Sequence, residues 1–180
     1  MTLVEISFEP PGAAADAGFL AQATDLVNRV YADAEKGIWH EGAERTSPEE
    51  LAGIVRAGEL ATARLGGQLV GAVRVRRLAS GEGEFGMLVA SPDHRGTGLG
   101  RRLVEFAEGW ALDRGLATMQ LELLVPREWT HPVKQFLHEW YTRIGYRPVR
   151  GGSLADDYPA LAPLLATPCD FVIYHKPLSR

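Results

Sequence analysis

The chain has 180 residues, a formal net charge of −4 at pH 7, 46% hydrophobic and 23% charged residues, a balance typical of one soluble globular domain. Its acidic character disfavours a general nucleic-acid binder, which presents a basic face, and no stretch approaches the ~20 apolar residues that span a bilayer. The N-terminus lacks the pattern of a signal peptide, and a single cysteine, Cys169, excludes an internal disulfide. We therefore expect a cytoplasmic protein without nucleic-acid or membrane partners, in which Cys169 is a small buried residue.

The spacing of apolar residues predicts the elements in chain order. Strands alternate apolar and polar positions, and helices carry apolar residues three or four positions apart. Ser47-Pro48-Glu49-Glu50 is a capping box with proline at the first helical position, which predicts a short helix ending near Gly58. The other predicted elements are a strand over 3–8, a helix over 16–34, a polar loop over 40–46, a hairpin of 60–66 and 68–78, a strand over 83–90, a helix that ends at Gly115, a strand over 117–125, a helix over 133–144, a strand over 146–150, a loop over 151–159, a short helix at 158–166 and a last strand over 170–176.

The stretch SPDHRGTGLGRRL, residues 91–103, places three glycines and three arginines directly before a helix. The first amides of a helix have no partner within it and lie at the positive end of its dipole, and glycine lets a ligand approach the backbone closely. This combination predicts a phosphate site, with a solvated glycine turn as the alternative. The P-loop is excluded because the chain has no Gly-Lys pair, and the dinucleotide fingerprint is excluded because Leu99 or Arg101 stands at its third glycine.

Residues 88–100 resemble the acetyl-CoA signature of the GNAT superfamily of N-acetyltransferases, with Arg95, Gly98 and Gly100 matching in spacing and identity. Residues 141–146, YTRIGY, are similar to the family's Tyr-x-x-x-Gly-aromatic element. A run of three strands, the last of which begins a strand-helix-strand-helix-strand series, already predicts an α/β (α+β) fold with a mixed sheet. The resemblance implies a GNAT-type, mostly antiparallel central sheet flanked by helices on both faces, in a single acetyltransferase domain over residues 1–180.

The resemblance also implies acetyl-CoA as co-substrate. The pantetheine arm is expected to run along the backbone of the strand before the glycines as an added strand. Arg95 is expected to reach a phosphate, while the family's cofactor-binding asparagine is replaced by Lys134, whose ammonium can meet a phosphate instead. The expected pantetheine contacts are Leu88, Val89 and Ala90, and the expected pyrophosphate contacts are Gly96, Thr97, Gly98, Leu99, Gly100 and Arg101.

The implied chemistry is direct attack of a primary amine on the thioester, which needs a base because an amine of pKa near ~10.4 is protonated at neutral pH. Glu84, eleven residues before Arg95, is our candidate base, with an exposed strand-end carboxylate as the alternative reading and Glu122 ranked below it. Tyr141 is the candidate acid for the leaving thiolate, or else a core residue. It lies on an apolar helix stripe made of Val133, Phe136, Leu137, Trp140, Tyr141 and Ile144.

The acceptor is not named by the sequence. The resemblance implies that the first two helices, the loop after the fifth strand and the loop between the last two strands shape the amine pocket, where acidic and aromatic residues would suit a cationic amine. The five histidines lack metal-site spacing, so we expect no metal. Two alternatives to acetyl transfer stay open, a longer acyl group and a non-catalytic acyl-CoA-binding module, and a homodimer is compatible with the resemblance. The candidate acceptor-side residues are Glu35, Trp39, His40, Trp129, His131, Asp156 and Asp157.

Overall fold

A computed structural model of the chain describes residues 3–180. Its centre is a seven-stranded sheet in the order β1-β2-β3-β4-β5-β7-β6. All neighbouring strands are antiparallel except β4 and β5, which are parallel, so the predicted mixed, mostly antiparallel sheet is confirmed. The strands are β1 (Val4–Phe8), β2 (Leu60–Leu65), β3 (Gln68–Arg77), β4 (Gly83–Ala90), β5 (Thr118–Pro126), β6 (Arg147–Ser153) and β7 (Cys169–Pro177).

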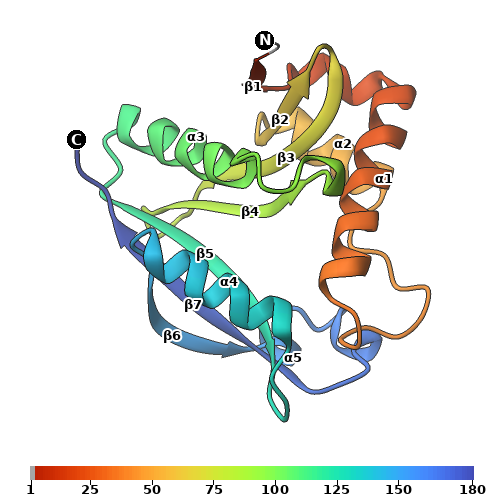
Figure 1. The fold of residues 1–180 in the computed structure, drawn as a ribbon, viewed down its shortest axis with the longest axis vertical. Helices are drawn as coiled ribbons and strands as arrows, with labels where there is room; N and C mark the ends of the chain where they lie inside the picture. The colour runs from red at the N-terminus through yellow and green to blue at the C-terminus, as the bar shows by residue number, and fades with distance from the viewer. Residues whose placement is uncertain (1–2) are drawn as a thin grey trace.

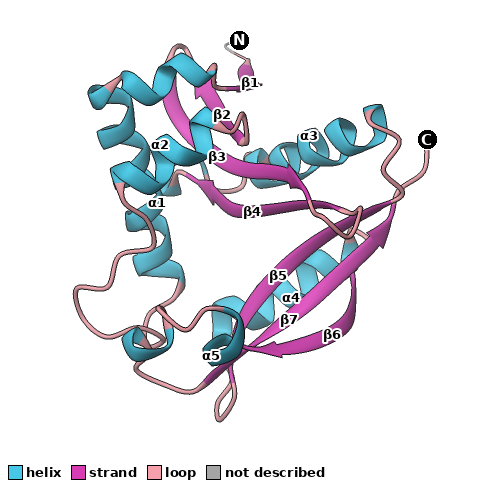
Figure 2. Ribbon diagram, turned by 180° about the vertical axis from the view of Figure 1, so that it is seen from behind, coloured by secondary structure: helices cyan, strands magenta, loops and turns pink. Residues whose placement is uncertain are grey.

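Helices cover both faces of the sheet (Figures 1 and 2). Helices α3 and α4 lie on one face, and α1 and α2 lie on the opposite face against β2, β3 and β4. Asp16 caps α1 by accepting from the Phe19 amide at 3.0 Å, and Ser47 caps α2 by accepting from the Glu50 amide at 3.1 Å. The helices are α1 (Ala17–Ala34), α2 (Pro48–Arg56), α3 (Leu99–Asp113), α4 (Pro132–Arg143) and the short α5 (Leu154–Asp157).

The sheet opens between its two parallel strands. Within the described residues β4 pairs with β5 only at Gly83–Met119 and Glu84–Gln120, and Figure 2 shows the two strands meeting at one end and diverging toward the other. On its other side β4 stays paired with β3 as far as Ala90. The edge of β4 that faces β5 is therefore free for hydrogen bonding beyond Glu84.

Three apolar clusters hold these layers together. The largest packs α3 and Tyr141 of α4 against the sheet, and a second packs α1 and α2 on the opposite face. A third, smaller cluster joins Ile38 to Leu124, Leu154 and Cys169. Burial raises the pKa of the Cys169 thiol to about 11, so this residue is a packed apolar side chain and not a thiolate nucleophile.

Most predicted elements are confirmed to within two residues, but the segment before the last strand is not. Residues 151–153, predicted as loop, continue β6, and Leu154–Asp157 form α5. The predicted helix at 158–166 is reduced to a 3₁₀ turn at Ala162–Leu164, because proline at 163 supplies no amide to the helix. Phe136, expected on the buried stripe of α4, is 58% exposed, whereas Lys134 is buried in its place.

No helix among residues 3–180 combines the length and apolar character needed to cross a membrane.

Candidate active site

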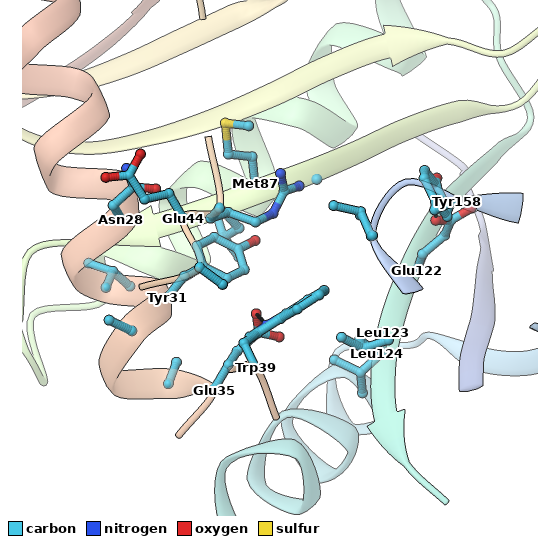
Figure 3. A pocket seen from close by; sticks show the side chains of 18 of the residues that line it. Asn28, Tyr31, Glu35, Trp39, Glu44, Met87, Glu122, Leu123, Leu124 and Tyr158 are labelled. Carbon is cyan, nitrogen blue, oxygen red and sulfur yellow. Dashed lines mark hydrogen bonds between the residues drawn. The ribbon is translucent and has the colours of Figure 1, made fainter. Parts of the chain in front are cut away.

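The divergence of β4 and β5 opens into a cavity of about 930 Å³. Figure 3 shows Tyr31, Glu35 and Trp39 on one side of it and Glu122 and Tyr158 on the other. The lining comes from α1 and its following loop, from β3, β4, β5 and α4, and from the chain between β6 and β7. Glu84 and Tyr141, which sequence reasoning proposed as base and acid, both line this one cavity.

The glycine stretch lies directly after the free edge of β4. Gly96 and Gly98 have φ of 75° and 77°, a left-handed conformation that disfavours side chains. Gly98 is the N-cap of α3 without a side-chain cap. Within residues 3–180 the amides of residues 98–101 have no hydrogen-bond acceptor. These unpaired donors at the positive end of α3 fit an anion such as a pyrophosphate.

The three arginines around the glycines have different surroundings. Arg101 pairs with Glu105 at 3.1 Å, and Arg102 donates to the carbonyl of Val4 at 2.9 Å. Arg95 is exposed and makes no ion pair within the described residues. Arg95 is therefore the arginine most available to an incoming phosphate.

A β-bulge changes the direction of β4 inside the cavity. Val73 of β3 faces both Met87 and Leu88, because the register shifts between the Ala72–Val89 and Arg74–Gly86 pairs. Met87 has φ of 51° and is the one non-glycine residue with positive φ in the described chain. A bulge bends its strand and leaves ladder groups unpaired, which suits a strand that separates from its neighbour and binds a ligand.

Tyr141 lies on α4 with its ring against Phe85, Tyr146 and Tyr174. Burial, reinforced by the neighbouring phenols of Tyr31 and Tyr174, raises the pKa of Tyr141 well above its usual range. Its hydroxyl makes no hydrogen bond to another residue of 3–180. Tyr141 is thus both a core residue and a protonated phenol that borders the cavity.

Glu84 lies at the point where β4 and β5 part. Arg76 of β3 donates to its Oε1 from Nε at 3.0 Å and from Nη2 at 2.8 Å, and Gln120 of β5 donates to its Oε2 at 2.9 Å. Gln120 is held in turn by His175 at 2.8 Å. Glu84 is therefore a nearly buried, fixed carboxylate with a cationic partner, and not an exposed strand end.

Glu122 lies two residues beyond Gln120 on β5 and faces the same cavity. Tyr158 donates to its Oε2 at 3.0 Å, and no cationic side chain forms an ion pair with it within the described residues. Burial, together with the charge of Glu84, raises the pKa of Glu122. Burial and the adjacent Glu122 raise the pKa of Tyr158 to about 12, so Tyr158 stays a hydrogen-bond donor to this carboxylate.

Lys134 does not have the environment that the sequence suggested. Its Nζ lies 2.5 Å from Oε2 of Glu35, and the two side chains are 6% and 5% exposed. The ammonium is therefore committed to a buried carboxylate, and the expectation that it meets a phosphate is not supported.

The acceptor-side candidates divide into three groups. Glu35, Trp39 and His40 line the cavity. Trp129 and His131 instead line a second hollow of about 600 Å³ near the start of α4, and Asp156 and Asp157 line neither. Among residues 3–180 no group of three or more His, Cys, Asp or Glu side chains is arranged to hold a metal ion.

Residues 24–146 match the model of the acetyltransferase (GNAT) family. The chain belongs to this family. The match covers more than half of the 180 residues and includes both the glycine stretch and Tyr141. This GNAT chain is accordingly an acetyltransferase. A search of curated proteins found no match.

Solved structures resemble this GNAT acetyltransferase in fold. An aminoglycoside 6′-N-acetyltransferase complexed with coenzyme A is 16% identical with a TM-score of 0.71, covering 98% of each chain. PaiA N-acetyltransferase from Thermoplasma acidophilum, in complex with coenzyme A, is 16% identical with a TM-score of 0.70, covering 97% of this chain and 99% of that one. An acetyltransferase from Bacillus anthracis in complex with acetyl coenzyme A is 17% identical with a TM-score of 0.53, and the match spans 67% of this chain but only 62% of that one.

Sequence reasoning missed several features of this GNAT site. Tyr31 and Tyr158 line the cavity but belong to no motif. The Arg76–Glu84 pair could have been suggested by opposite charges on adjacent predicted strands, whereas the Lys134–Glu35 pair joins residues 99 positions apart and left no local signal.

Proposed function

We propose that this acetyltransferase moves the acetyl group of acetyl-CoA to a primary amine by direct attack, without a covalent enzyme intermediate. The observation that carries the proposal is the free edge of β4. It leads from a cavity lined by Glu84 and Tyr141 to the unpaired amides at the start of α3. The solved relatives with bound coenzyme A support this choice of donor.

The donor is bound by backbone more than by side chains. The pyrophosphate would lie on the amides of residues 96–101, with Arg95 adding a positive charge. The pantetheine arm would pair with Leu88, Val89 and Ala90 as an added strand, because β5 has already diverged from β4 there. Backbone donors freed near the Met87 bulge would stabilise the oxyanion that forms on the thioester oxygen.

The acceptor nitrogen must lose a proton to attack the thioester carbon. Glu84 remains our proposed base, since it lines the cavity and its Oε2, which accepts only from Gln120 within the described residues, retains a lone pair for the amine proton. Glu122 is the second candidate, because it has no cationic partner among residues 3–180 and its raised pKa brings its basicity closer to neutral pH. The proton moves to the carboxylate directly or through one water.

Tyr141 is the proposed acid. Collapse of the tetrahedral intermediate breaks the carbon–sulfur bond and leaves the electron pair on sulfur, which takes the phenolic proton to give the CoA thiol. The burial that raises the pKa of Tyr141 keeps the proton on the phenol at neutral pH, so the group is available as a donor. Its lack of a partner within residues 3–180 leaves the hydroxyl free to point at the sulfur.

The proposal is tested by measuring acetyl-CoA binding by calorimetry and CoA-thiol release over a library of primary amines. We expect binding and turnover with at least one amine, and Tyr141→Phe to lower turnover by about 10²- to 10⁴-fold while acetyl-CoA affinity stays unchanged. Binding without turnover for any amine would favour the acyl-CoA-binding module. Faster turnover with a longer acyl-CoA would show that the transferred group is not acetyl. An absence of acetyl-CoA binding would refute the proposal.

The base is assigned by pH–rate profiles of Glu84→Gln and Glu122→Gln with the best amine of that library. The base should produce a limb in the pH–rate profile where it ionises. If this limb is lost in the Glu84 variant and kept in the Glu122 variant, Glu84 is supported as the base. An unchanged profile in the Glu84 variant, together with loss of the limb in the Glu122 variant, would move the role to Glu122.

A further inference from the structure

The buried pair of Lys134 and Glu35 lies in the wall of the cavity. Lys134 belongs to the first turn of α4, while Glu35 is the C-cap of α1. Their side chains meet at 2.5 Å, and both residues line the cavity. The pair therefore connects the helix layer on one face of the sheet to the helix layer on the other, across the opening between β4 and β5.

The same carboxylate also holds an aromatic side chain of the cavity. The indole Nε1 of Trp39 donates to Oε1 of Glu35 at 3.0 Å, while Lys134 occupies Oε2. Figure 3 shows the Trp39 ring extending from beside Glu35 into the space between Tyr31 and Leu123. Lys134, Glu35 and Trp39 thus form a chain of contacts that ends on a surface available to the acceptor.

Hydrogen bonds to the backbone also hold the segment 36–40 in place beside the contacts of Lys134, Glu35 and Trp39. His131, the N-cap of α4, accepts from the Val133 amide on Nδ1 at 3.2 Å, so its Nε2 carries the proton and donates to the carbonyl of Lys36 at 2.9 Å. The His40 amide donates to the carbonyl of Leu164 at 2.8 Å, and the Ala166 amide donates to the carbonyl of Ile38 at 2.8 Å. The segment 36–40 is therefore packed between α4 and the chain that enters β7.

We propose that Lys134 is a positioning residue for the acceptor: through Glu35 it holds the Trp39 indole as a wall of the acceptor cavity, and it takes no part in binding coenzyme A. The physical reason is the cost of an uncompensated buried charge. Removal of Lys134 alone leaves the Glu35 carboxylate in a nearly dry site without a cation, so the carboxylate has to move toward water and take Trp39 with it. Neutralising both partners removes that cost.

The test is a mutant cycle made of Lys134→Met, Glu35→Gln and the double variant. In the double variant the glutamine keeps an amide oxygen for the Trp39 indole, and no charge remains in the site. Lys36→Met is the matched control, because it also replaces a lysine by methionine but does so next to Glu35 in the chain, where Lys36 is exposed and lies 3.7 Å from Asp33. Each protein is measured by calorimetry with acetyl-CoA and by hydrogen exchange at the His40 and Ala166 amides.

We expect Lys134→Met to lower protection of these two amides by about tenfold or more, the double variant to recover it to within about threefold, and Lys36→Met to leave it unchanged. Acetyl-CoA affinity should stay within about twofold in all four proteins. The kinetic arm, which alone depends on the proposed function, should show a tenfold rise in the acceptor KM for Lys134→Met with little change in the acetyl-CoA KM.

Two results would overturn the proposal. One is a loss of acetyl-CoA affinity in Lys134→Met with unchanged exchange, which would assign Lys134 to the donor. The other is a double variant as perturbed as Lys134→Met, which would show that the charge of Glu35 is not the cause. The exchange arm gives its answer even if no amine is acetylated, so the failure of this proposal and that of the proposed function are distinguishable.

Discussion

Gly98→Ala separates the folding role of the glycine stretch from its proposed role in binding coenzyme A. Gly98 has φ of 77°, and a Cβ built on it meets no atom of residues 3–180 within 4 Å. The substitution therefore costs only the strain of a left-handed alanine, about 1–2 kcal/mol. At about 2–4 °C per kcal/mol for a chain of this size, the melting temperature should fall by about 2–8 °C.

Gly115→Ala is the matched control at the other end of α3. Its φ is 71°, and a Cβ there also meets nothing within 4 Å, so its cost to stability should be similar. Of these two glycines, only Gly98 is proposed to contact the pyrophosphate, and an added methyl group there would push the pyrophosphate away from the helix amides. Loss of one hydrogen bond to a charged group costs about 1.5–3 kcal/mol, or about tenfold to a hundredfold in affinity.

Calorimetry with acetyl-CoA and thermal unfolding of both variants check this reasoning. Gly98→Ala should bind at least about tenfold more weakly than the wild type, and Gly115→Ala should bind as the wild type does, although both melt earlier. Equal acetyl-CoA affinities in the two variants would refute the placement of the pyrophosphate at the start of α3.

Three further predictions concern stability. Gly71→Ala should lower the free energy of unfolding by about 1–3 kcal/mol, since a Cβ there would lie 3.0 Å from the carbonyl oxygen of Val89. Gly109→Ala, in open space within α3, should raise it by up to about 1 kcal/mol in the same denaturant titration. Because the folded-state pKa of Glu122 is raised, the stability from its protonated form is lost as pH rises. Glu122→Gln should therefore unfold at higher denaturant than the wild type at pH 8 and at the same denaturant near pH 3.

The elements that form the proposed donor site could be predicted from sequence because they are local. The strand, the glycines and the helix start lie within about twenty residues, and a helix N-terminus offers unpaired amides whatever lies elsewhere in the fold. Residues 83–90 and the helix that ends before Gly115 were placed correctly for the same reason. The bulge at Met87 left no sign in the sequence, since it depends on the register between β3 and β4.

The acceptor side could be predicted only in part, because its contacts are long-range. Glu35 and Lys134 are 99 positions apart, and Glu122 meets Tyr158 across 36 positions. The resemblance suggested acidic and aromatic residues in three segments, and only Glu35, Trp39 and His40 among them line the cavity. Asp157 does not line the cavity, whereas its neighbour Tyr158 does.

The contacts around Glu84 join the fold to the proposed chemistry. This carboxylate accepts from Arg76 on β3 and Gln120 on β5, so three strands meet at the point where the sheet opens. Glutamine at position 84 would keep an acceptor for Arg76 but would lose the charge that balances the guanidinium. A fall in turnover in Glu84→Gln is therefore not sufficient to identify a base, because a shifted β5 would produce the same fall. The pH–rate profile distinguishes the two causes, since displacement of β5 lowers the rate at every pH, whereas loss of the base removes one ionisation from the profile.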